Sequence, residues 1–321
     1  MHVVVVERDG RVERADAVDP AWLEPGATTT VWVDIEAPDE HDRRLLLDTF
    51  RIHELAVEDA LEDIHYPKIE TDDGLLYLIL HGIAPGTGAA RFETQDMDFF
   101  IASRFLVTVH KGPSRSITAE RDACLRRPDL FADGPAGLCH RIVDRLVDHY
   151  GPEVDDIERR LEVIEGAVFE SAGHGALRDL LVIKRDIAAL RRVALPQRDA
   201  IGRLARREFP QISETLVYRF RDVYDQFVRL SEQAILLQDR ATGLVDAFLS
   251  NQSNRLNQVM KVLTVISTIF MPLSVITGLW GMNVSIPEWP GGPDAQVWWI
   301  VAIMLALAAA MLVVFRRMRW L

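Results

Sequence analysis

Two long uncharged stretches near the C-terminus dominate the hydrophobic pattern of this chain. Residues 262–280 and 297–315 each run for 19 positions without a charged side chain. At about 1.5 Å per helical residue, each stretch would span about 28 Å, close to the roughly 30 Å hydrocarbon thickness of a bilayer. The second has Trp298 and Trp299 near its start and arginines after its end, as is typical of membrane boundaries. The pattern therefore predicts two transmembrane helices.

The charges that flank these stretches predict their orientation. The connecting loop, residues 282–296, contains Glu288 and Asp294 but neither lysine nor arginine, whereas Arg255, Lys261 and the C-terminal arginines flank the other ends. Lysine and arginine concentrate on the cytoplasmic side of membrane proteins. We therefore expect a multi-pass protein of the cell (inner) membrane with both termini in the cytoplasm. We expect no export signal, because charged side chains follow the first apolar residues within a few positions.

The first part of the chain, residues 1–135, mixes two hydrophobic periods. Short β-branched or aromatic runs alternate with segments whose apolar residues have helical spacing, which predicts a cytosolic α/β domain. Asp9 and Gly10, between the first two runs, suit the tight turn of a hairpin. Predicted strands cover residues 2–7, 11–14, 29–35, 75–83, 96–102 and 105–110, and predicted helices cover residues 39–52 and 53–63 and follow Ser114.

From about residue 136 the strand signal ends and heptad-like apolar spacing predicts helices. Residues 136–211 would form a helical stalk hairpin. The stretch between Pro210 and Pro272 contains no other proline and a single glycine, Gly243, so it would form a rod of about 90 Å, three times what a bilayer needs. We therefore predict an α+β membrane protein in which a stalk helix continues into the membrane. The predicted segments are 1–135, 136–211, 212–281 with the first span at 262–281, the external loop 282–296, the second span 297–315 and a basic cytosolic tail 316–321.

The charge of the chain is concentrated outside the membrane spans. The 321 residues include 36 basic and 48 acidic side chains, a formal net charge of −12, which argues against nucleic acid as a partner. Without the three arginines and two carboxylates of residues 262–321, the remainder has 33 basic and 46 acidic groups and a net charge of −13. Cys124 and Cys139 are too few for a disulfide framework or a four-thiolate zinc site.

The sequence lacks the motifs of the common hydrolases and ATPases. His53 and Glu54 begin like a zinc-protease helix, but Val57 stands where the second histidine would have to be, so a helix with a polar first residue is the better interpretation. No glycine-rich phosphate loop and no Gly-x-Ser-x-Gly elbow occurs. We therefore expect neither an enzyme nor an organic cofactor.

One face of the first predicted membrane helix and its upstream extension is unusually polar. At alternating steps of three and four residues, every position on it is small, polar or a thioether, which is the period of helices packed about a common axis. Such a stripe suits either close helix packing or an ion pore, and the upstream carboxylates favour a pore, because acidic rings attract cations. We name this face the seam; it comprises Asp239, Gly243, Asp246, Ser250, Ser253, Asn257, Met260, Thr264, Ser267, Met271, Ser274 and Gly278.

The membrane portion of the seam has no carboxylate and no histidine. Mg²⁺ gives up its waters reluctantly, so amide, hydroxyl and thioether groups could pass it in hydrated form. A Zn²⁺ carrier would instead be expected to offer histidine, cysteine or carboxylate ligands along its path. The seam therefore favours Mg²⁺ as the transported ion.

The triplet Gly281, Met282 and Asn283 closes the first predicted span, and it is the signature of the CorA family of divalent-cation channels. The surrounding residues 253–264 and 268–273 also resemble that family. The chain therefore resembles the CorA family, within the CorA/ZntB superfamily, over nearly its whole length. Further similar segments are residues 32–35, 66–70, 105–110 and 220–225.

The resemblance implies a homopentameric funnel in the lipid bilayer that carries Mg²⁺, with Co²⁺ as a related cargo, and that also binds Mg²⁺ as a regulatory ligand. Gly281, Met282 and Asn283 would form the external selectivity ring. Asp222 would be half of a regulatory site between subunits, and Glu70, Asp72 or Asp73 of a neighbour would complete it. The residues implied to line the pore are Asp246, Asn257, Met260, Leu263, Thr264, Met271, Ser274 and Gly278.

Two departures from the family pattern leave alternatives open. Trp280 stands where tyrosine is more frequent, and the loop after Asn283 combines the pair Pro287 and Glu288, as in Mg²⁺ members, with a Gly-Pro-rich stretch like that of the zinc-transporting ZntB branch. A Zn²⁺ or Co²⁺ transporter, proton-coupled or not, is therefore the first alternative. A membrane-anchored sensor or scaffold, in which the seam only packs helices and no ions flow, is the second.

Overall fold

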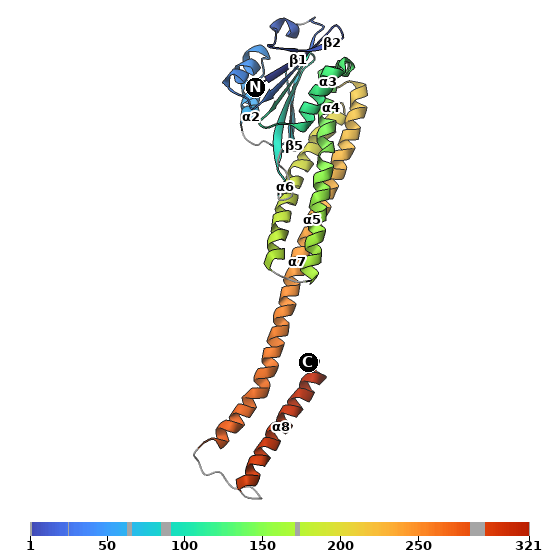
Figure 1. Cartoon of the computed structure of the whole chain (residues 1–321). Coiled ribbons are helices and arrows are strands. Elements are labelled where there is room, and N and C mark those ends of the chain that lie inside the picture. Colours follow the sequence, from blue (N-terminus) through green and yellow to red (C-terminus); the bar gives the residue numbers. More distant parts are fainter. Residues whose placement is uncertain are drawn as a thin grey trace. The chain divides into compact units, whose positions relative to one another are not determined.

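The computed structural model describes residues 2–24, 26–62, 66–84, 91–170, 174–282 and 293–320 (Figure 1). The chain divides into two compact units, Met1–Val245 and Asp246–Leu321. The first contains a β-sheet and a helical stalk, and the second contains the apolar helices. Two helices, Glu214–Trp280 and Ala295–Arg317, are long and apolar enough to cross a membrane, and they contain the predicted spans 262–280 and 297–315.

The sheet of the first unit has seven strands in the order β2-β1-β3-β7-β6-β5-β4. Neighbouring strands are antiparallel except for the parallel pair β3 and β7. The β1–β2 hairpin turns at Asp9 and Gly10, which both have positive φ, as predicted for this tight turn. The strands are β1 (His2–Arg8), β2 (Arg11–Ala15), β3 (Thr30–Glu36), β4 (Lys68–Asp72), β5 (Leu75–Ile83), β6 (Thr94–Ile101) and β7 (Phe105–His110).

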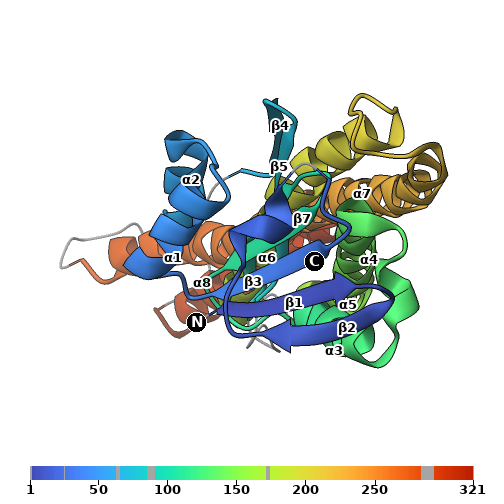
Figure 2. The same ribbon diagram turned by 90° about the horizontal axis from the view of Figure 1, so that it is seen from above.

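Helices cover both faces of the sheet (Figure 2). One face packs on η2 and α2 through Leu46, Phe50 and Val57. The other face packs on α4, whose Ile142 and Leu146 are fully buried or nearly so. The helical elements are η1 (Pro20–Leu23), α1 (Glu40–Arg44), the π-helical turn η2 (Leu45–Thr49), α2 (Glu54–Leu61), α3 (Arg115–Arg126), η3 (Pro128–Phe131), α4 (Gly134–Asp148), α5 (Tyr150–Glu170), α6 (His174–Ala205), α7 (Glu214–Trp280) and α8 (Pro293–Arg317).

The observed elements follow the predicted ones closely, with three differences. The sequence pattern does not single out the edge strand β4, which is short and polar. The segment predicted as one helix over residues 39–52 is α1 followed by η2. The heptad-like run from about residue 136 onward is split at His149 into α4, which packs on the sheet, and α5, which belongs to the stalk. His53 caps α2 by accepting a hydrogen bond from the Leu55 amide at 3.2 Å, which confirms its interpretation as a helix start.

A buried carboxylate ties the central strands to α3. Asp34 accepts hydrogen bonds from Thr108 Oγ1 at 2.7 Å and from Arg121 Nη1 at 2.7 Å, and its Oδ1 lies 3.1 Å from His110 Nε2. Burial lowers the pKa of His110, but the hydrogen bond to Asp34 and its negative charge outweigh burial and raise it. A buried charge is tolerated only when it is paired and hydrogen-bonded. This network therefore holds β3, β7 and α3 in one arrangement.

A ring of hydrogen bonds joins the sheet to the stalk. Gln197 of α6 accepts from the His81 amide at 3.0 Å and donates to the hydroxyl of Tyr150 at 3.0 Å. That hydroxyl in turn donates to the His81 carbonyl at 2.7 Å. Gln197 and Tyr150 are almost fully buried, so each partner satisfies a group that would otherwise lose its hydrogen bond to water. The ring fixes the position of β5 against α5 and α6.

The sheet also holds an acid whose protonation differs from that of a surface carboxyl. Tyr77 donates to Asp98 Oδ1 at 2.6 Å, and burial raises the pKa of Asp98 to about 7 although the hydrogen bond from Tyr77 lowers it. Lys68 lies over the Tyr77 ring, 5.5 Å from its centroid, and pairs with Asp59 at 2.7 Å. Asp98 therefore keeps its proton to a higher pH than an exposed carboxyl does.

We expect Asp98→Asn to change the pH dependence of stability. The ordinary pKa of an aspartate is 3.8, and that of Asp98 in the folded state is about 7. Between these two pH values the folded state binds the Asp98 proton more tightly than the unfolded state does. This group's contribution to the free energy of unfolding therefore falls as pH rises through that window, by up to about 1.4 kcal/mol per pH unit. The Asn variant should be more stable than the wild type at about pH 8, with a difference that shrinks at about pH 5. Thermal unfolding at both pH values measures this.

The exposed Asp48 provides a matched control for this prediction. Asp48→Asn should keep the wild-type pH dependence, because a solvent-exposed carboxyl is similarly hydrated in the folded and unfolded states. Parallel stability curves for the wild type and Asp98→Asn would contradict the prediction.

Candidate ion-conduction path

The seam lies on a single helix, α7, which runs without interruption from Glu214 to Trp280. All of its members are exposed in the single chain, among them Asn257, Thr264 and Ser274. Between residues 262 and 282 the only buried side chain is that of Val265. The seam is therefore an exposed stripe of small, polar and thioether side chains along a helix that is mostly apolar at this level.

Hydroxyl groups on or beside the seam bond to their own helix. Thr264 Oγ1 donates to the Met260 carbonyl at 2.8 Å, and Thr277 Oγ1 donates to the Ser274 carbonyl at 3.1 Å. Such bonds use the hydroxyl hydrogen and leave the oxygen free to accept. The hydroxyl oxygens can then accept from the waters of a hydrated cation. Pro272 has no N–H to donate to the carbonyl four residues earlier, so that carbonyl oxygen lacks its usual partner within the helix.

Apolar side chains alternate with the polar positions predicted to line the pore. Met260, Leu263 and Met271 are exposed by 58%, 55% and 69%. In the same unit Asp246 is also exposed, eleven residues before Asn257. One helix thus presents a carboxylate, an amide and then alternating apolar and hydroxyl groups along its length.

The end of α7 explains the glycine of the triplet. Gly281 donates to the Thr277 carbonyl at 2.9 Å, and a Cβ at this position would lie 3.1 Å from that same oxygen. A larger residue would require the Thr277 carbonyl to shift by a few tenths of an ångström. Met282, exposed by 56%, is the last residue described before the loop. Asn283 and Glu288 lie outside the described residues, so their predicted roles remain predictions.

The proposed regulatory residue Asp222 is exposed on the first part of α7 and lies near acids of α4. Burial raises the pKa of Asp144, and the negative charges of Asp148 and Asp222 raise it further. Spacing along the sequence did not indicate Asp144, because the proximity arises from the packing of α4 against α7. Among the described residues, no group of three or more acidic, histidine or cysteine side chains could hold a metal ion, so a site at Asp222 would need a further contributor.

The acids predicted as partners of Asp222 lie at an edge of the sheet. Glu70 pairs with Lys68 at 3.2 Å, whereas Asp73 has a positive φ of 40° and forms the β4–β5 turn with Gly74. Asp72, the last residue of β4, is exposed like the other two. These side chains are accessible to a neighbouring chain, and their predicted pairing with Asp222 of another subunit remains a prediction.

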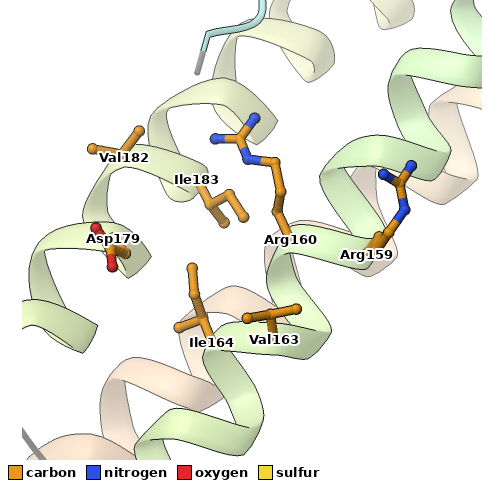
Figure 3. A pocket seen from close by; sticks show the side chains of 7 residues that line it. All are labelled: Arg159, Arg160, Val163, Ile164, Asp179, Val182 and Ile183. Atoms are coloured by element: carbon orange, nitrogen blue, oxygen red, sulfur yellow. The ribbon is translucent and has the colours of Figure 1, made fainter. Parts of the chain in front are cut away.

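A separate groove of about 460 Å³ lies between α5 and α6 (Figure 3). Ile164 and Ile183 point into it, and Val163 and Val182 line its sides. Arg160 at its edge pairs with Asp186 at 2.8 Å. The groove is therefore a largely apolar feature of the stalk hairpin. Its lining residues belong to α5 and α6, whereas the seam lies on α7.

A sheet domain, a helical stalk and two apolar C-terminal helices, with a polar seam on the first of them, define a membrane protein built to carry ions. Residues 27–317 match the CorA-like Mg²⁺ transporter protein family, and the chain belongs to this family. The family membership confirms the resemblance drawn from the Gly-Met-Asn triplet and its surroundings.

Relatives match over almost the entire chain. The Bacillus subtilis protein YfjQ is 33% identical over 313 residues, covering 96% of this chain and 93% of its own length. The cobalt/magnesium transport protein CorA of Thermotoga maritima is 28% identical over 300 residues, covering 92% of this chain and 84% of its own length. The solved structure of the CorA magnesium transporter of Methanocaldococcus jannaschii superposes with a TM-score of 0.84 at 20% identity, covering 100% of this chain and 99% of the other. That match confirms the predicted fold class.

A side chain added to the seam tests whether the seam faces the conduction path. A Cβ at Gly278 would meet no atom within 4 Å in the single chain, so Gly278→Leu should not disturb its fold. If the seam lines a pore, the leucine projects into it, and we expect ion flux in reconstituted vesicles to fall by about tenfold or more, equivalent to at least about 1.4 kcal/mol.

Gly166→Leu is the matched control, because Gly166 on α5 also has open space around its Cβ position and lies off the seam. This variant should keep wild-type flux. Unchanged flux in Gly278→Leu would argue against a pore along the seam.

Proposed function

We propose that this protein is a homopentameric Mg²⁺ channel of the cell (inner) membrane, with both termini in the cytoplasm and α7 of each subunit lining the central path. The observation that carries the proposal is the seam: a polar, uncharged and exposed face that continues through the apolar span of a CorA-family chain. A scaffold that only packed helices would not need carboxylates continuing on the same face at Asp246 and Asp239.

The chemistry of the path suits a hydrated ion. Asn283 amides, with Gly281 and Met282, would form the external ring and bind the ion through its waters, since Mg²⁺ usually keeps several of them. Glu288 in the same loop would raise the local concentration of cations. The rings of Met260, Leu263 and Met271 would form the hydrophobic gate, and Asn257 a polar ring at the inner end.

The membrane potential supplies the driving force. A divalent ion that crosses about 100 mV gains about 4.6 kcal/mol, so inward transport needs no nucleotide site. The net charge of −13 on residues 1–261 would surround the inner mouth with acidic protein. Screening limits the reach of that charge to about 8 Å, so it concentrates cations at interfaces rather than at long range.

Cytosolic Mg²⁺ would also regulate the channel. Bound between Asp222 of one subunit and Glu70, Asp72 or Asp73 of the next, it would lock neighbouring subunits together. When the ion leaves, repulsion between the carboxylates would loosen the interface and open the gate. The exposure of these four side chains is compatible with such a site.

Asn283→Ala tests the selectivity ring. Removal of the amide takes away the groups that hold the waters of the ion, so Mg²⁺ uptake into reconstituted vesicles should fall by about tenfold or more. Ser285→Ala, in the same loop but outside the triplet, should keep wild-type uptake. Unchanged Mg²⁺ uptake in Asn283→Ala would show that the selectivity ring is assigned wrongly.

Asp222→Ala tests regulation. The variant should need a several-fold higher internal Mg²⁺ concentration for half-inhibition of uptake, because one ligand of the regulatory ion is lost. Asp225→Ala, another exposed acid one turn along α7, should be inhibited as the wild type is. Equal sensitivity of Asp222→Ala and the wild type would remove Asp222 from this role.

Co²⁺ is a second candidate cargo, favoured by two relatives named cobalt/magnesium transport proteins. Competition among Mg²⁺, Co²⁺ and Zn²⁺ in the same vesicles, with and without a pH gradient, would rank the ions and reveal any proton coupling. Dominant Zn²⁺ uptake that depends on the gradient would favour the ZntB-like alternative.

A further inference from the structure

The C-terminal end of α8 is closed by a defined turn. Arg319 adopts a left-handed conformation with φ of 57°, and its amide donates to the Arg316 carbonyl at 3.1 Å. The Trp320 amide donates to the Phe315 carbonyl at 3.0 Å, and the rings of these two residues lie 5.9 Å apart. This pair of hydrogen bonds with an apolar contact is the Schellman motif. The turn thus fixes the direction of the chain after the helix.

Three arginines lie within or beside this turn. Arg316, Arg317 and Arg319 are exposed, and no ion pair joins any of them to another residue in the described part of the chain. By contrast, Arg141 and Arg160 in the first unit pair with carboxylates. Three unpaired arginines within four residues are a strong attraction for an anion, and the planar fork of arginine matches the oxygens of a phosphate.

The position of the turn at the end of an apolar helix indicates that the phosphate belongs to a lipid. The arginines directly follow the uncharged stretch 297–315, so they lie where hydrocarbon gives way to headgroups. Val314 and Met318 beside them are exposed by 53% and 57% and offer apolar surface to an acyl chain. The indole of Trp320 suits the same boundary. A phosphate attached to a lipid would therefore contact both kinds of group at once.

We propose that Arg316, Arg317 and Arg319, arranged by the Trp320 turn, bind the headgroup phosphate of an anionic phospholipid in the cytoplasmic leaflet. The inference rests on the membrane orientation given in the proposed function. Binding would hold the cytoplasmic end of α8 at a fixed depth. The arginines thereby act as a lipid site rather than only as a topology signal.

The test uses the full-length protein in phosphatidylcholine vesicles that contain a trace of spin-labelled phosphatidylglycerol or, separately, spin-labelled phosphatidylcholine. Electron paramagnetic resonance then measures the fraction of each lipid immobilised by the protein. The wild type should immobilise phosphatidylglycerol several-fold more than phosphatidylcholine. The triple variant R316Q/R317Q/R319Q should lose at least about fivefold of this preference, since each basic residue near an anionic surface contributes about 1 kcal/mol.

A second variant removes one charge without endangering the fold. Arg319→Gly should preserve the turn, because glycine favours positive φ, and should still weaken the preference by up to about fivefold. The control R255Q/K261Q removes two charges from α7 and should keep the preference. An equal loss in the control, or no loss in the triple and Arg319→Gly variants, would overturn the proposal.

Two further measurements distinguish the lipid site from a site for soluble anions and from the channel activity. Excess inorganic phosphate should not displace the lipid; if it does, the site takes soluble anions and the lipid proposal is wrong. Mg²⁺ flux in the same vesicles reports on the proposed function independently. Flux without lipid preference would overturn only the lipid site, whereas lipid preference without flux would overturn only the channel.

Discussion

The physical constraint on which the rest depends is that polar groups cannot face hydrocarbon without a partner. Helix α7 carries its polar seam straight through an apolar span, and in a single chain that seam is exposed. Hydroxyls on or beside it donate to carbonyls of their own helix, and their oxygens remain free to accept from water or from another polar surface. An axis shared with other copies of the chain would supply such partners, and the proposed assembly and transport both rest on this arrangement.

The sheet unit meets a different requirement, because it must keep a precise shape while carrying many acids. It does so by pairing the buried ones. Asp34 is held by Thr108, His110 and Arg121, and Glu120 by Arg141 and Arg145. The ring formed by His81, Tyr150 and Gln197 then fixes the sheet on the stalk. A movement of α5 or α6 would have to break hydrogen bonds that have no water to replace them, so sheet and upper stalk are expected to move together.

Local sequence patterns predict those parts of the structure that local forces determine. The spans, six of the seven strands and the long helix all follow from hydrophobic period and from the distribution of proline and glycine. The His81–Gln197 hydrogen bond joins residues 116 positions apart, and the proximity of Asp144 to Asp222 depends on how α4 packs against α7. Neither contact can be predicted from the spacing of residues along the sequence. Strand β4 could not be predicted in this way, because a short polar edge strand has no buried face to mark it. Of the site, the seam is a local property of one helix and could be predicted, whereas any contact between subunits is not encoded in the spacing of one chain.

The raised pKa of Asp98 has a consequence for the electrical character of the protein. The formal charge of −12 counts this carboxyl as ionised, yet burial raises its pKa to about 7, well above that of an exposed aspartate. The cause is burial, because Asp98 is only 4% exposed and the Tyr77 hydroxyl is its hydrogen-bond partner. The formal sum therefore counts as ionised one carboxyl whose neutral form is favoured by the fold.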